Sequence, residues 1–291
     1  MNVSMVFSGS FHVYSGGKSL LAGCPPEIVK VLIQDGFSAK NAILLPDIPV
    51  AQGESQVAIE FPLYHHLFFG KQPETSEPLL LIGNRGRLSA ARELLNLTLF
   101  GPSTDQMQEW GMEKDASIGL SRETRWFHLK DHEGKPLPLE AMVRTQTFDH
   151  DPVDLGWLQI RRVTKNVFEF SAGGDTETVD LTPPAEQAPP YPVIPDLTTT
   201  TLVKMGVEIL GGSTGFSTTQ ASSGLALCYN GHYMLVDAIP YLNSHLRARG
   251  IARNQVGSIF SATFTTTIVT SSHCFSTTDR SKFSPLHSST G

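Results

Sequence analysis

The sequence predicts a mixed α/β fold, because strand and helix patterns alternate, turn residues separate them and the apolar content is ordinary. Short apolar runs such as SLLAG, AILLP and PLLLIG alternate with helical stretches such as EIVKVLIQDG and LSAARELLNLTLFG. Glycine and proline mark the changes of pattern, as expected where one element ends and the next begins. The chain has 291 residues, of which 40% are hydrophobic, so it is long enough for one large domain or two small ones.

Composition and charge argue against several classes of protein. The net charge of -6 comes without a basic patch, so no nucleic-acid partner is indicated. Residues 1–17 lack a basic stretch followed by a long apolar run, and no segment is long and apolar enough to span a bilayer, so we expect a cytoplasmic protein. The three cysteines, Cys24, Cys228 and Cys274, are too scattered for a disulfide framework and are expected to be buried or idle thiols.

Changes in composition divide the chain into five segments. The runs WLQIRRV and NVFEFSAGG are typical of strands, and the six prolines of PPAEQAPPYPVIPDLTT are typical of an extended linker. The last segment is rich in Ser and Thr, and its His273 and His287 receive no role. We expect an α/β half in 1–105, a β-rich connector in 106–182, a proline-rich linker in 183–199, part of a second domain in 200–260 and a disordered tail in 261–291.

Residues 203–260 hold the most specific pattern. A first strand ends in a Gly-rich turn, Ser222 and Ser223 lead into a second strand, and Asn230-Gly231 predicts a hairpin to a third strand that ends at Asp237. The glycines of the first turn are Gly211, Gly212 and Gly215, which we expect to adopt positive φ. This run resembles the first strands of the metallo-β-lactamase superfamily, especially its ribonuclease Z and cyclic-nucleotide phosphodiesterase relatives.

The resemblance implies a role for Asp237 and a fold of αββα type. Asp237 matches the acidic residue at the end of a strand which, in this superfamily, braces the loops of the metal site by hydrogen bonds. The alternative is an ordinary acidic residue at a helix start, since Pro240 and a helical pattern follow. We expect helices outside two facing sheets, in an incomplete copy at the C-terminal end of the chain.

The metal-binding motif of that superfamily is missing from the sequence. After VGSIF the pattern requires H-x-H-x-D-H, whose imidazoles and carboxylate hold zinc-type ions that activate water. The chain reads SATFTTTIVTSSHC instead, and hydroxyl or alkyl groups do not replace such ligands. We therefore expect no metal ligand, no known catalytic residue and no cofactor in this chain; zinc or another divalent metal is expected only in intact relatives.

A one-base frameshift near Ser261 accounts for the loss of the motif. Codons read across Ala262/Thr263, Phe264/Thr265, Thr266/Thr267 and Thr267/Ile268 allow His, His, Asp and His in the required order. The hypothesis is that the chain is truncated by a frameshift before its catalytic remainder. The bases of the gene from Phe260 onward test this directly.

A second, fainter copy of the pattern lies near the N-terminus. A shift of 214 positions aligns five pairs of residues in the order of the chain. The pairs are Gly17 with Gly231, Leu21 with Leu235, Pro26 with Pro240, Leu32 with Leu246 and Gly36 with Gly250. This predicts a degenerate lactamase-like first half without histidines after AILL, whereas two unrelated βα units sharing turn glycines are the alternative.

Two other groups of residues are candidate sites. His65 and His66, with Asp47, could in principle serve as metal ligands, but adjacent residues of a regular element point in different directions. The loop with Gly83, Arg85, Gly86 and Arg87 follows a strand and opens a helix, so it could bind an anion, or it could be a plain connection between a strand and a helix.

Three functions follow from these patterns. The first is a metallo-β-lactamase-fold hydrolase homologue of phosphodiesterase-like lineage that is inactive as this chain. The second is a non-catalytic protein that binds a ligand or partner through its N-terminal α/β region. The third is a metalloenzyme that uses unrecognised ligands. An incomplete sandwich also leaves open strands, so self-association through exposed sheet edges is expected.

Overall fold

The computed structural model describes residues 1–36, 42–51, 54–55, 57–69, 77–148, 152–183, 188–195 and 204–260. It has a mixed α/β fold with several sheets, as the sequence predicts. Its elements up to the largest helix are β1 (Asn2–Phe7), β2 (Ser10–Ser15), β3 (Lys18–Ala22), α1 (Ile28–Gln34), β4 (Ala42–Leu44), β5 (Val50–Ala51), β6 (Glu54–Ser55), α2 (Glu60–Phe69), β7 (Leu79–Gly83) and α3 (Arg85–Phe100).

The remaining elements include a helical segment, a second sheet and a third sheet. The helical segment holds α4 (Thr104–Glu109), α5 (Lys114–Thr124), a 3-10 turn at Arg125–Phe127 and α6 (Leu139–Met142). Then come β8 (Val143–Thr147), β9 (Val153–Asp154), β10 (Gln159–Thr164), β11 (Val167–Ala172) and β12 (Asp175–Asp180). The last are β13 (Met205–Gly211), β14 (Gly224–Tyr229), β15 (His232–Val236), α7 (Leu242–Ala248), a 3-10 turn at Arg253–Gln255 and β16 (Val256–Phe260).

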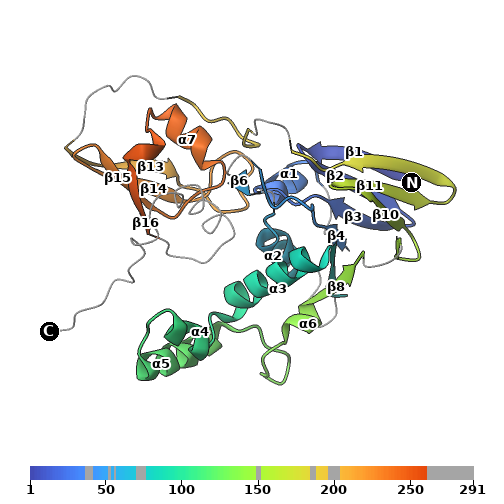
Figure 1. Ribbon diagram of the computed structural model, residues 1–291, viewed down its shortest axis with the longest axis horizontal. Helices are drawn as coiled ribbons and strands as arrows, with labels where there is room; N and C mark the ends of the chain where they lie inside the picture. The colour runs from blue at the N-terminus through green and yellow to red at the C-terminus, as the bar shows by residue number, and fades with distance from the viewer. Residues whose placement is uncertain are drawn as a thin grey trace.

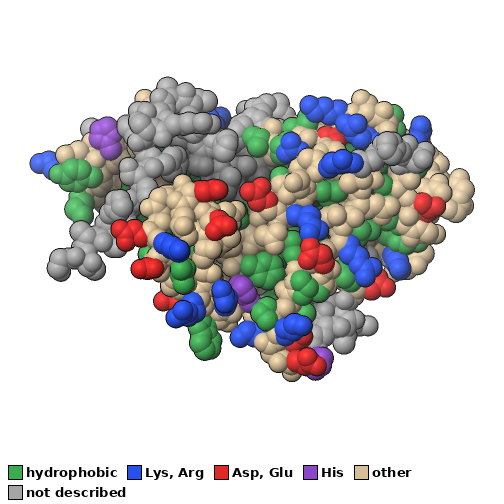
Figure 2. All heavy atoms as spheres, turned by 60° about the horizontal axis from the view of Figure 1, so that its bottom comes forward, with side chains coloured by type: hydrophobic (Ala, Val, Ile, Leu, Met, Phe, Trp, Pro, Cys, Tyr) green, Lys and Arg blue, Asp and Glu red, His purple; other side chains and the backbone are tan. Residues whose placement is uncertain are grey.

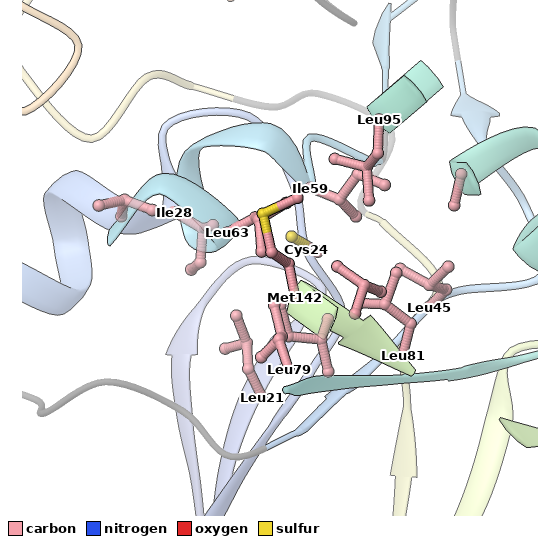
Figure 3. Close-up of a cluster of buried hydrophobic side chains, with 14 of the residues drawn as sticks. Leu21, Cys24, Ile28, Leu45, Ile59, Leu63, Leu79, Leu81, Leu95 and Met142 are labelled. Carbon is pink, nitrogen blue, oxygen red and sulfur yellow. The ribbon is translucent and has the colours of Figure 1, made fainter. Parts of the chain in front are cut away.

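A six-stranded sheet in the order β1-β2-β3-β4-β7-β8 organises the first half of the chain. One face is covered by helices: Figure 3 shows Leu21 and Leu81 of the sheet pointing toward Leu63 of α2 and Leu95 of α3. The other face packs against the sheet β12-β11-β10-β9, so that Leu20 contacts a second core with Phe168 and Phe170. The two cores on opposite faces follow from the alternation of side chains along each strand.

Part of the predicted β-rich connector is helical. Strands occupy it only from Val143 onward, and the segment before them holds α4, α5 and α6. Ser103 starts α4 with a capping box, in which its hydroxyl accepts from the backbone N–H of Gln106 and the Gln106 side chain accepts from the Ser103 N–H. The sequence analysis did not single out this Ser-x-x-Gln helix start, which stands among residues of mixed charge. A hairpin turn at Gly173-Gly174 joins β11 to β12.

Two segments of the chain have the same architecture, and we call them the first and second repeats. The first repeat consists of β1, β2, β3, α1 and β4, and the second of β13, β14, β15, α7 and β16. In each, the first three strands pair antiparallel and the fourth joins the third in parallel. The second repeat lies at one end of the molecule, with α1 between it and the large sheet (Figure 1).

From the second strand to the helix, the repeats correspond residue by residue at the shift found in the sequence. The bounds of β14, β15 and α7 are those of β2, β3 and α1 moved by 214 positions, and Phe11↔Ala22 becomes Leu225↔Val236. Both helices begin after a residue in the left-handed region, Glu27 with φ 64° and Tyr241 with φ 55°. Left-handed backbone is uncommon for such side chains, so shared turns of this kind confirm the predicted internal repeat.

The described part of the linker contributes to the second repeat. Tyr191 is buried and packs with Leu235 and Leu242 in a third core. The other linker residues 184–187 and 196–199, and the whole predicted tail, lie outside the described residues. Cys24 and Cys228 are buried thiols, as expected, while Cys274 falls in the tail.

Candidate functional site

The ends of β15 and β16 lie side by side, at the place where the superfamily pattern expects its metal-binding residues. The backbone N–H of Asp237 donates to the carbonyl of Phe260 at 2.9 Å. Asp237 has a positive φ of 54°, and its counterpart in the first repeat, Gly23, has a φ of 81°. The residue that the resemblance selects therefore stands at the carboxyl end of this parallel strand pair, directly beside the end of the described chain segment.

Two of the three glycines at the end of β13 and just after it, Gly211 and Gly215, are explained by close approach, and the predicted positive φ was wrong for all three. A Cβ on Gly211 would collide with the Ser222 carbonyl oxygen and lie 2.7 Å from the Cβ of Ala221. A Cβ on Gly215 would lie 2.9 Å from the Phe61 ring Cζ. The turn therefore needs small residues because other parts of the chain press against it.

Gly211→Ala is expected to lower the free energy of unfolding by about 1–3 kcal/mol, because the added methyl must displace backbone atoms. Gly212→Ala is the matched control, since its Cβ would meet no heavy atom within 4 Å. Urea unfolding followed by circular dichroism measures both. Equal stability of the two variants would contradict the close-approach explanation.

Asp47 lies just beyond β4, the first-repeat counterpart of the strand that precedes the missing motif. Its carboxylate accepts from Arg162 Nε at 2.9 Å, from the Asn166 backbone N–H at 2.9 Å and from Asn84 Nδ2 at 3.0 Å. Burial would raise the pKa of Asp47, but these hydrogen bonds outweigh it and hold the pKa below its usual value. A guanidinium cation occupies the place beside the carboxylate, so these residues do not fit a divalent metal ion.

Asp47→Asn is expected to reduce the free energy of unfolding by about 2–3 kcal/mol, because charge-assisted bonds to buried groups are lost. The control is Glu169→Gln, whose partner Arg161 is 58% exposed, and which should cost less than about 1 kcal/mol. Thermal and urea unfolding at neutral pH provide the comparison. A D47N variant as stable as E169Q would show that the Asp47 contacts contribute little.

The other candidate ligands are not brought together with Asp47. His65 and His66 lie within α2, and His66 Nε2 is 3.0 Å from the Glu77 carbonyl oxygen. Among the residues that the structure describes, no three His, Cys, Asp or Glu side chains gather in a way that could hold a metal ion.

The predicted anion-binding loop starts α3 and already has an acidic neighbour. Asn84 caps the helix by accepting from the Arg87 backbone N–H at 3.0 Å, and its amide also donates to Asp47. Gly83 is buried, whereas Arg85 and Gly86 are exposed. The carboxylate of Asp47 therefore lies beside the helix N-terminus that an incoming anion would approach.

A buried ion pair of the first repeat, which the sequence analysis missed, is hydrogen-bonded to the second repeat. Lys30 Nζ lies 2.6 Å from Glu27 Oε2, donates to the Gln220 carbonyl at 2.7 Å and lies 4.9 Å from the centre of the Tyr191 ring. Glu27 also accepts from Ser222 Oγ at 3.2 Å. A lysine inside the apolar run IVKVLI was the one signal that could have pointed to this contact.

His245 completes this junction from the second repeat. It is 3% exposed, its ring lies 6.0 Å from that of Tyr191, and neither of its ring nitrogens has a hydrogen-bond partner among the described residues. Burial, helped by the nearby charges of Arg249 and Lys30, lowers the pKa of His245 to about 4. The imidazole is therefore neutral at physiological pH.

Two further observations concern the surface and the helices. Acidic and basic side chains are interspersed over the face shown in Figure 2. In the described part of the chain, no helix has the length and apolar character needed to cross a membrane.

Comparisons with known proteins give two solved structures of interest. No family model and no curated protein matches the chain. One is the crystal structure of MEM-A1, a subclass B3 metallo-β-lactamase from a soil metagenome library. It matches this chain with 14% identity and a TM-score of 0.27, and the match covers 61% of this chain and 61% of that protein. Human tRNase Z, short form, matches with 11% identity and a TM-score of 0.22 over 81% of this chain and 68% of that one.

Proposed function

We propose that this chain is a metallo-β-lactamase-fold hydrolase homologue of phosphodiesterase-like lineage that has lost its metal ligands and does not catalyse hydrolysis. The observation that carries the proposal is the sequence after β16. The strand ends beside Asp237, and the next eight residues, SATFTTTI, contain no imidazole or carboxylate. A hydrolase of this kind needs both to hold the ion that supplies its nucleophile.

The first repeat does not supply a substitute. Asp47 stands after β4, but its carboxylate accepts hydrogen bonds from Arg162 and Asn166. The guanidinium of Arg162 neutralises the negative charge that would otherwise attract a metal ion. We infer that the frameshift proposed from the sequence removed the catalytic remainder and that the protein stays in the cytoplasm. The alternative, ligand binding through the loop at Arg85 and Arg87, has weaker support because Asp47 lies beside that helix start.

Metal analysis and a phosphodiesterase assay on the purified full chain test the proposal. We expect no stoichiometric zinc, manganese or iron and no turnover of bis-p-nitrophenyl phosphate. The matched variant carries Thr263→His, Thr265→His, Thr267→Asp and Ile268→His, which writes H-x-H-x-D-H at the required spacing. Gain of metal by this variant alone supports the proposal, whereas stoichiometric metal with turnover in the unmodified chain overturns it.

Sequencing the gene tests the cause of the loss separately. The bases after the Phe260 codon should encode H-x-H-x-D-H in the shifted frame. If that frame lacks the motif, the frameshift is excluded, while the proposal of an inactive homologue stands on the metal analysis.

A further inference from the structure

One face of the second-repeat sheet is apolar and exposed. The strand pairing places Met205, Val207, Tyr229, Met234 and Phe260 on the same face, together with Ile209. Their exposed fractions are 80%, 59%, 67%, 36%, 46% and 57% in that order. We call these six residues the open face. Large apolar side chains clustered in this way mark a surface that binds another molecule.

The first repeat shows what such a face packs against. Val13 and Leu20 are the counterparts of Leu227 and Met234 at the shift of 214 positions, and both are fully buried. Their cover is the sheet β9–β12, through Phe168 and Phe170 among others. The matching surface in the second repeat therefore has the shape and chemistry of a sheet-packing face, and β9–β12 is already used by the first repeat.

Charge and area favour a second copy of the same chain as the partner. The strand residues on the open-face side include no Asp, Glu, Lys or Arg, so two copies can approach without like-charge repulsion. Because a fully exposed large side chain offers about 150–250 Å², the six residues provide roughly 600 Å² per copy. Two copies together reach about 1,200 Å², the lower end of stable interfaces.

We propose that the open face binds the open face of a second copy, forming a homodimer by sheet-on-sheet packing. The contact is self-complementary, so a two-fold axis closes it after two chains and leaves no face for a third. This goes beyond the edge-to-edge association expected from the sequence, and it does not depend on whether the chain hydrolyses anything.

Analytical ultracentrifugation of the full chain over a wide range of concentration tests the dimer. The unmodified chain should sediment as a dimer that dissociates on dilution. Val207→Lys should raise the dissociation constant by roughly a hundredfold or more, because an unpaired ammonium would be buried in each half of the interface. The matched control is Val163→Lys on β10, at a valine that is 49% exposed, and it should leave the dimer intact.

Two further measurements keep the test independent of one variant. Tyr229→Lys, on the neighbouring strand, should also give monomers with an unchanged circular dichroism spectrum. In the unmodified chain, binding of the dye ANS should increase on dilution as the apolar face is released. The proposal is overturned if the unmodified chain is a monomer at all concentrations or forms aggregates of indefinite size. It is also overturned if the dimers of Val207→Lys and Val163→Lys have equal dissociation constants.

Discussion

Lys30→Met is expected to lower the free energy of unfolding by about 3–5 kcal/mol, because it leaves the carboxylate of Glu27 buried without its counter-ion. Lys30 is 1% exposed and Glu27 is 9% exposed. Burial raises the pKa of Glu27, and the ammonium of Lys30 opposes that shift. The variant also removes the bond to the Gln220 carbonyl, and so it weakens the contact between the two repeats.

The double variant Glu27→Gln with Lys30→Met is the control for this prediction. It removes both charges and keeps the size of the side chains, so it should recover a large part of the lost stability. Urea unfolding of the three proteins at pH 7, followed by circular dichroism, gives the comparison. A single Lys30→Met variant that loses less than about 1 kcal/mol would show that the pair is not coupled to folding.

The second prediction concerns pH. The folded chain holds the pKa of His245 at about 4, below the usual value of 6.5, so protonation opposes folding. The stability that depends on neutral His245 is therefore fully present above pH 6.5 and is lost as the pH falls toward 4. Between pH 7 and pH 5 this loss amounts to about 2 kcal/mol.

His245→Phe should remove this part of the pH dependence and leave the rest. Both proteins keep Arg249 and Lys30, the two charged groups that act on the ring, so their own contributions cancel in the difference between the two unfolding curves. The measurement is urea unfolding at pH 7 and pH 5 for each protein. An equal loss of stability on acidification in both would refute the assignment to His245.

Local sequence signals predicted the second repeat well. The Asn230-Gly231 hairpin is present, the strand predicted to end at Asp237 ends one residue earlier at Val236, and a helix follows Pro240. Such turns depend on a few neighbouring residues, so a pattern in the sequence is sufficient to find them. The internal repeat was visible for the same reason, since its aligned glycines and prolines stand at turns.

The contacts between distant segments could not be predicted in this way. Lys30 meets Gln220 across 190 positions, and Asp47 meets Arg162 across 115. No periodicity or motif relates such residues, because only the folded chain brings them together. The roles expected for Gly211 and Gly215 were wrong for a related reason: their small size is required by Ala221, Ser222 and Phe61, whose positions a turn pattern does not reveal.

The hydrogen bond from the Tyr241 hydroxyl to the Pro26 carbonyl, 3.0 Å long and spanning 215 positions, has a consequence for biosynthesis. The ribosome makes Pro26 and the first repeat long before Tyr241 emerges, so the earlier strands can fold first. The later strands then meet a preformed surface rather than an unfolded chain. Ribosomes stalled at increasing chain lengths should therefore carry a protease-resistant N-terminal half before the last helix has been synthesised.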